Sequence, residues 1–166
     1  MKKITKSKHI LRSLHAALLA TSSYTKGLVA ALVVWGGFFL YIWPKMLWQG
    51  ADGLMAGHHF VWADMSAHMV YAAPFAYRAP ADWFDAHPLF AGASFTYPFL
   101  PDAISGWLIR LGMPISDSFV FPSILASIAL VYILYRFAFH FTANAKASFL
   151  VIGGFFLSGG LGFLVV

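Results

Sequence analysis

Three long apolar stretches limit what this chain can fold into more than any other feature of its sequence. They cover residues 27–48, 119–141 and 149–166, and they contain almost no charged side chains. A helix needs roughly 20 apolar residues to cross the hydrocarbon core of a bilayer, and lipid tolerates only helices and closed barrels. The pattern therefore predicts an all-α membrane protein with three transmembrane helices.

The composition excludes both an ordinary soluble domain and a disordered chain. Apolar residues make up 60% of the sequence and charged residues 10%, whereas soluble domains average about 45–50% and about 25%. The 17 Phe, 7 Tyr and 6 Trp residues favour burial over disorder. The absence of cysteine rules out disulfides, thiolate zinc sites and cysteine nucleophiles.

The charges are distributed unevenly along the chain. Residues 1–26 carry six of the 11 Lys and Arg residues and no acid, while all 6 acidic residues are Asp and lie between residues 27 and 118. A basic arm before an apolar stretch sets the orientation of a membrane protein, whereas a nucleic-acid-binding face would spread over a folded surface. We expect no nucleic-acid partner, and we predict a cytoplasmic arm (1–26), an outer loop (49–118) and a cytoplasmic turn (142–148).

Both ends of the chain bear on this interpretation. A cleaved signal peptide is the alternative for the basic start and the first apolar stretch, but the two further apolar stretches favour a polytopic protein. The third stretch runs to Val166 without a polar flank or a helix stop signal. We therefore expect a fragment of a longer integral membrane protein.

The outer loop is too long for a simple connector, so we expect it to carry function. Residues 62–77 are rich in Ala and are expected to be helical at least up to Pro74. Helical spacing then places Asp64, His68 and Tyr71 on one face, so that a carboxylate and an imidazole share a site at the membrane surface. The alternatives are an N-cap role for Asp64 and an interfacial role without function for His68.

A second, short amphipathic helix is expected from Asp102 to Leu111. Pro101 suits the first position of such a helix, and Gly112 suits the position just after its end. Asp102 would then place a favourable negative charge in the first turn of the helix, which is the alternative to a functional role.

Asp64 is the candidate general base, because partial desolvation at the lipid boundary raises the pKa of a carboxylate. His68 is expected to orient Asp64 or to contact a phosphate group. We assign no metal ligand: His59, Asp64 and His68 are suitable types for a divalent ion, but their spacing matches no metal-binding signature. Whether a divalent metal ion is a cofactor stays open.

Two arginines and several aromatic residues of the loop are candidates for substrate binding. Arg78 and Arg110 are its only guanidinium groups, and arginine binds phosphate in a bidentate way. Anchoring to lipid headgroups is the alternative. The candidate substrate- and phosphate-binding residues are Arg78, Arg110, His87, Asp102 and Tyr97.

Short motifs of the loop resemble a family of membrane enzymes. They read Asp-Met-Ser-Ala-His at 64–68, His-Pro-Leu-Phe-Ala-Gly at 87–92 and Tyr-Pro-Phe-Leu-Pro-Asp at 97–102, and a Leu-Gly pair follows. This order after one apolar span resembles the start of GT-C type membrane glycosyltransferases, more narrowly the bacterial and archaeal relatives of the protein mannosyltransferases and Rgt-like transferases. The resemblance covers about residues 34–166.

The resemblance implies an enzyme that transfers a sugar from a polyprenyl-phosphate carrier to an acceptor at the outer face of a bacterial or archaeal plasma membrane. Its partners would be this sugar donor and the membrane lipids. In such enzymes an acidic residue of the first outer loop serves the reaction, and Asp64 stands at the matching position. Asp64 lacks the adjacent acid that some members carry.

Two other classes of function stay open. A transporter component would place ionisable groups inside its spans, and only Arg136 and His140 come near this, both close to the end of a span. A noncatalytic assembly subunit would have the same spans without a shared acidic site.

Overall fold

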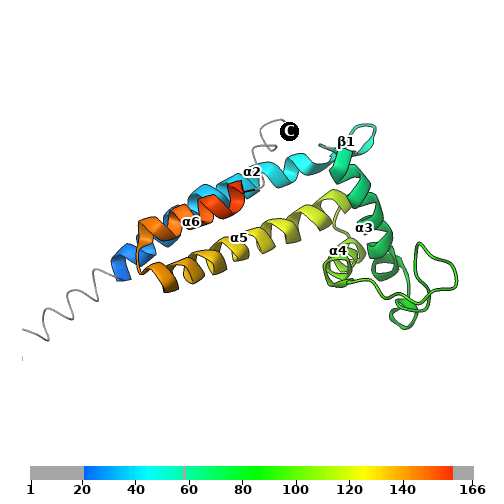
Figure 1. Ribbon diagram of the computed structural model, residues 1–166. Helices are drawn as coiled ribbons and strands as arrows, with labels where there is room; N and C mark the ends of the chain where they lie inside the picture. The colour runs from blue at the N-terminus through cyan, green and yellow to red at the C-terminus, as the bar shows by residue number, and fades with distance from the viewer. Residues whose placement is uncertain (1–20, 58, 159–166) are drawn as a thin grey trace, which may run out of the picture. The chain divides into compact units, whose positions relative to one another are not determined.

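Figure 1 shows the computed structural model of the chain, which describes residues 21–57 and 59–158. These residues form two compact units, one made of residues 21–38 and 128–158 and the other of residues 39–57 and 59–127. Most of them are helical. After the start of the first helix, the elements are η1 (Leu32–Gly36, a π-helical stretch), α2 (Gly37–Met46), β1 (Leu47–Gly50), β2 (Gly53–Ala56), α3 (His59–Tyr77), η2 (Pro80–Asp82, a 3-10 turn), α4 (Leu100–Arg110), α5 (Ile115–Thr142) and α6 (Ala145–Leu157).

Two of the helices are long and apolar enough to cross a membrane. One covers Thr21–Met46 and includes η1 and α2, and the other is α5. Both are longer than the predicted spans, because the first includes residues 21–26 and α5 begins at Ile115, directly after Pro114. The third predicted span, 149–166, lies partly outside the described residues. Its described part belongs to α6, a helix of 13 residues.

The predicted cytoplasmic turn at 142–148 contains the junction between α5 and α6. Only Ala143 and Asn144 separate α5 from α6. Ala143 has a positive φ of 48°, and the Asn144 side chain accepts hydrogen bonds from the backbone N–H groups of Lys146 (2.9 Å) and Ala147 (3.1 Å). This N-cap starts α6 four residues before the predicted third span, because it satisfies two of the free donors of the first turn.

Aromatic side chains hold the unit of residues 21–38 and 128–158 together. Tyr135 is fully buried, and its hydroxyl donates to the Tyr24 carbonyl at 3.1 Å. A Cβ atom at Gly27 would collide with this hydroxyl, so only glycine allows the first helix to lie this close to α5. On α6, Phe156 packs against Trp35 with ring centroids 4.9 Å apart.

A short antiparallel hairpin, β1–β2, overlaps the start of the predicted outer loop and departs from the predicted all-α fold. Leu47 pairs with Ala56 and Gly50 with Gly53, which leaves Ala51 and Asp52 as the turn. Gly53, the first residue of β2, adopts a φ of 128°, which glycine tolerates. The hairpin closes where the Gly57 N–H donates to the Met46 carbonyl at 3.0 Å.

The helices α3 and α4 cross at Gly106. A Cβ atom there would lie 2.5 Å from the Ala72 carbonyl oxygen and 2.7 Å from Phe75 Cβ. Tyr71, Phe75, Phe95 and Ala103 form a buried cluster beside the crossing. The helix α3 continues through Pro74 to Tyr77, beyond the minimum that the sequence predicted.

The end of α4 confirms the predicted stop signal. Gly112 has a φ of 93° and donates its N–H to the Ile109 carbonyl at 2.9 Å. The Met113 N–H donates to the Leu108 carbonyl at 3.0 Å. These two bonds form a Schellman motif, which satisfies carbonyls that the helix leaves free.

We expect Gly106→Ala to destabilise the fold relative to Gly154→Ala. Alanine gains about 1 kcal/mol of helix propensity at either position. Only at Gly106 does the added methyl group meet backbone atoms, whereas nothing lies within 4 Å of a Cβ at Gly154. Overpacking should cost about 1–3 kcal/mol, so the Gly106 variant should melt at the lower temperature when circular dichroism follows unfolding in detergent. Equal melting temperatures would contradict the close crossing.

Candidate functional site

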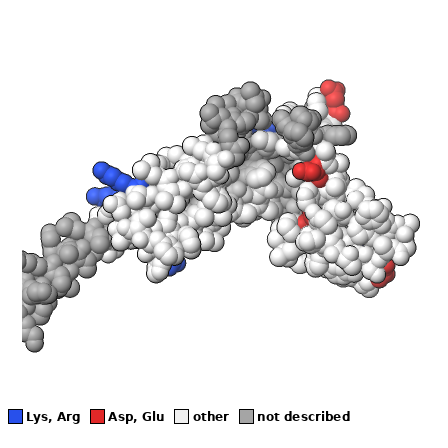
Figure 2. Space-filling view, viewed as in Figure 1, with Lys and Arg blue, Asp and Glu red and all other residues white. Residues whose placement is uncertain are grey.

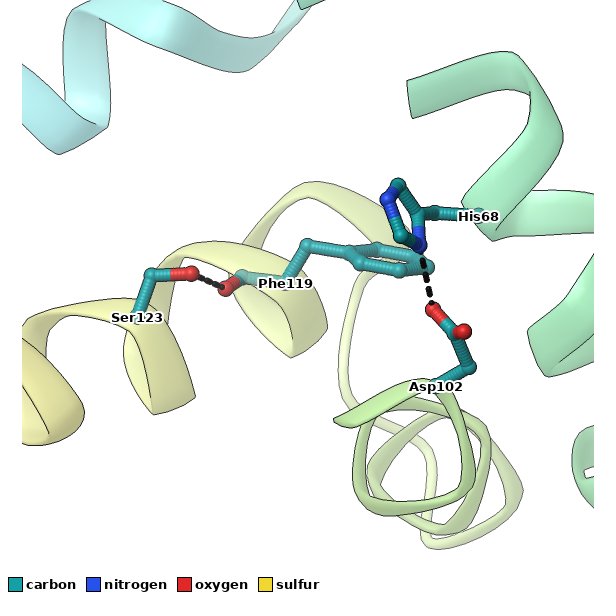
Figure 3. Close-up of polar contacts among 4 residues, drawn as sticks. All are labelled: His68, Asp102, Phe119 and Ser123. Carbon is teal, nitrogen blue, oxygen red and sulfur yellow. Dashed lines mark hydrogen bonds and ion pairs between the residues drawn. The ribbon is translucent and has the colours of Figure 1, made fainter. Parts of the chain in front are cut away.

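The crossing of α3 and α4 brings His68 and Asp102 together. His68 lies one turn before Ala72 on α3, and Asp102 lies one turn before Gly106 on α4. Their side chains point toward one another, with His68 Nδ1 2.9 Å from Asp102 Oδ1 (Figure 3). This distance is that of a good hydrogen bond between an imidazole and a carboxylate.

Asp102 is a buried carboxyl group with one unpaired oxygen. It is 2% exposed, and its Oδ2 atom has no hydrogen-bond partner among the residues that the structure describes. Burial raises the pKa of Asp102 above its ordinary value of 3.8, and the hydrogen bond and the charge of His68 offset this rise only in part. The position in the first turn of α4 also favours the charged form, as the sequence predicted for a helix N-terminus.

His68 is one-third exposed, at 33% of its side-chain surface. When its Nδ1–H donates to Asp102, the lone pair resides on Nε2, and this nitrogen is free to take up a proton. The carboxylate then stabilises the imidazolium that forms. Tyr71 and Tyr97 present their rings edge-on to the imidazole, with centroids 6.4 and 6.3 Å away.

A cleft of about 300 Å³ lies beside this pair, between α3, α4 and the first turns of α5. Most of its walls are apolar, for example Met65, Ile104 and Phe119. Ser123 also lines the cleft, but its hydroxyl donates to the Phe119 carbonyl of its own helix at 2.8 Å (Figure 3). A group bound here would meet an imidazole and a carboxyl among mostly apolar side chains.

The structure pairs His68 with a different carboxylate from the one that the sequence predicted. Asp64 lies one turn before His68 on α3, but its side chain is exposed and does not line the cleft. No hydrogen bond or ion pair joins the two in the described part of the chain. The N-cap interpretation of Asp64 is wrong, because α3 begins five residues earlier at His59.

Arg110 uses its guanidinium group within the fold. Its Nε donates to the Ala76 carbonyl at 3.2 Å, a terminal amino group donates to the Arg78 carbonyl, and the guanidinium carbon lies 5.9 Å from the centre of the Trp83 ring. These contacts close the end of α3, where carbonyls lack helical partners. The Arg78 side chain is exposed. A phosphate-binding role for either arginine stays a prediction.

The other two candidate residues gather with His68 around Tyr71. Tyr97 stacks on the Tyr71 ring at 4.2 Å, and His87 lies edge-on to it at 5.7 Å. Four of the seven predicted site residues therefore lie in one neighbourhood, namely His68, His87, Tyr97 and Asp102. Sequence reasoning missed the wall that α5 supplies with Phe119, Pro122, Ser123 and Ala126, because the spacing of residues along one helix does not show which helices pack together.

Within residues 21–57 and 59–158, no three His, Asp or Glu side chains come together as a group that could hold a metal ion. A comparison of the chain with protein-family models, curated proteins and solved structures found no match.

We expect the stability difference between the wild type and Asp102→Asn to depend on pH. Burial raises the pKa of Asp102 in the folded state. The folded chain therefore binds the proton of this carboxyl group more tightly than the unfolded chain does. The wild type should be most stable relative to the variant below the ordinary pKa of 3.8, and it should lose this advantage as pH rises through the raised value.

Melting temperatures of the wild type and Asp102→Asn, measured across the acidic pH range, test the direction of this pH dependence. Asp52→Asn, which changes an exposed carboxylate in the hairpin turn, should follow the wild type throughout. An advantage of the wild type over Asp102→Asn that grows as pH rises would mean that attraction to His68 outweighs burial.

Proposed function

We propose that this chain is part of a membrane glycosyltransferase that uses the His68–Asp102 pair for proton transfer. The sugar would come from a polyprenyl-phosphate carrier and pass to an acceptor at the outer membrane face. The observation that carries the acid–base assignment is the 2.9 Å contact between His68 Nδ1 and the buried Asp102, beside an apolar cleft. Such an arrangement of imidazole and carboxylate is typical of general base sites.

The assignment to sugar transfer rests on the resemblance of the three loop motifs. Their meeting around Tyr71 supports it: His68 comes from the motif at 64–68, His87 from that at 87–92, and Tyr97 and Asp102 from that at 97–102. Residues that bind one substrate are expected to lie close together in the fold even when their motifs are distant in sequence. The two membrane-length helices support a donor that resides in lipid.

The proposed reaction requires only a few contributions from the protein. A sugar on a lipid phosphate already has a good leaving group, so the enzyme must deprotonate the acceptor hydroxyl, offset charge on the departing phosphate and exclude water. In the proposed step the acceptor oxygen bonds to the anomeric carbon, and the bond from that carbon to the phosphate oxygen breaks with its electron pair. His68 Nε2 takes the hydroxyl proton, and Asp102 stabilises the imidazolium.

We expect His68→Gln and Asp102→Asn to lose sugar transfer in the full-length protein. Loss of a positioned general base costs about 10²–10⁴-fold in rate, and loss of its orienting carboxylate falls in a similar range. The assay measures transfer of label from tritiated polyprenyl-phosphate mannose or glucose in membranes. Asp52→Asn, on the exposed hairpin turn, serves as the control for expression and insertion.

Asp64→Asn separates the two candidate bases. Transfer that survives in this variant but is lost in His68→Gln assigns proton removal to His68. The opposite pattern returns the role to Asp64 and refutes the proposed pair. Transfer at the wild-type rate in all three variants would refute an acid–base role for this site.

A further inference from the structure

A second and larger cleft lies in the unit of residues 21–38 and 128–158. It has a volume of about 690 Å³ and lies between the first helix and the beginning of α6. Lys26 and Lys146 stand on its two sides, and Ser22 and Ser23 add hydroxyl groups. Neither lysine has a part in the proposed acid–base chemistry.

The unit that contains this cleft has basic side chains and no acidic side chain that would neutralise them. Residues 21–38 and 128–158, which form this unit, contain no Asp or Glu. Figure 2 shows Lys and Arg side chains, in blue, at the end of the first helix and α6 where α6 begins. The N-terminus of α6 contributes further partial positive charge. An anionic group is therefore the electrostatic complement of this cleft.

The remaining lining of the cleft is apolar. Ala30, Phe149 and Leu150 continue it along the two helices, and Leu150 is 71% exposed. Inorganic phosphate or a soluble anion would leave these side chains uncovered. A ligand that fits both parts carries an anionic headgroup and a hydrocarbon chain.

We propose that this cleft binds one anionic phospholipid, independently of the proposed transferase activity. The lipid phosphate lies between Lys26 and Lys146, the serine hydroxyls meet the headgroup, and an acyl chain covers Phe149 and Leu150. Lysines near a membrane surface attract anionic lipids, and basic pockets between transmembrane helices are known to take such headgroups. A zwitterionic lipid fits less well, because its own cation faces the two lysines.

Lipid retention by the purified full chain tests the proposal. The chain is immobilised in detergent, exposed to equal amounts of phosphatidylglycerol and phosphatidylcholine with identical acyl chains, and washed, and bound lipids are then counted by mass spectrometry. We expect preferential retention of phosphatidylglycerol. The double variant Lys26→Gln and Lys146→Gln should lower this preference about fivefold for each lysine.

Two matched controls separate this site from general attraction. Lys45→Gln with Arg136→Gln removes the same number of charges from residues that do not line the cleft, and it should keep the preference. Ala30→Trp fills the cleft with its charges intact and should lower retention. Val29→Trp places the same side chain on an exposed neighbour outside the lining and should not lower retention.

Three outcomes would overturn the proposal. These are equal retention of the two lipids by the wild type, equal losses in the lysine pair and its charge-matched control, and complete displacement of phosphatidylglycerol by excess inorganic phosphate. The last result would describe a site for a free anion.

Discussion

The close approach of α3 and α4 at Gly106 is the contact on which the candidate site depends. The absence of a side chain allows the backbone of α4 to approach the Ala72 carbonyl and Phe75. Because His68 and Asp102 each lie one turn before this crossing, their separation is set by the helix packing. A helix pair fixed by backbone contact holds two side chains more precisely than a loop does.

Burying the carboxyl group of Asp102 costs free energy, and this cost favours a functional role over a structural one. Asp102 is nearly inaccessible, only one of its oxygens has a partner in the described chain, and burial raises its pKa. The contact with His68 repays only part of this penalty. Groups with perturbed pKa values and a specific partner beside a cleft are concentrated at functional sites. An apolar residue at this position would serve a purely structural core better.

The sequence predicted well those features that local signals determine. Apolar length identified the two long helices, and Gly112 marked the end of α4, which begins at Leu100 and so before the predicted start at Asp102. The hairpin was not predicted, because its two turn residues, Ala51 and Asp52, are not one of the pairs that favour two-residue hairpin turns.

The partner of His68 could not be found in the same way. Asp64 was chosen because it lies four residues away on one helix, whereas Asp102 lies 34 residues away and approaches only through tertiary packing. The same limit applies to the cleft, since α5 supplies one of its walls. Helical spacing relates residues within one helix and carries no information about which helices cross.

The distribution of charge connects the two proposed sites. All acidic residues belong to the unit of residues 39–127, and the other unit has only basic ones. If both long helices cross a bilayer, the segment between them lies on one side and the turn at Ala143 and Asn144 on the other. In the proposed binding mode, Lys26 and Lys146 would hold the end at this turn in a leaflet with anionic lipids, and the bias of Lys and Arg favours the cytoplasmic leaflet. We propose that the His68–Asp102 pair then lies at the outer face, where a carrier-linked sugar would meet its acceptor.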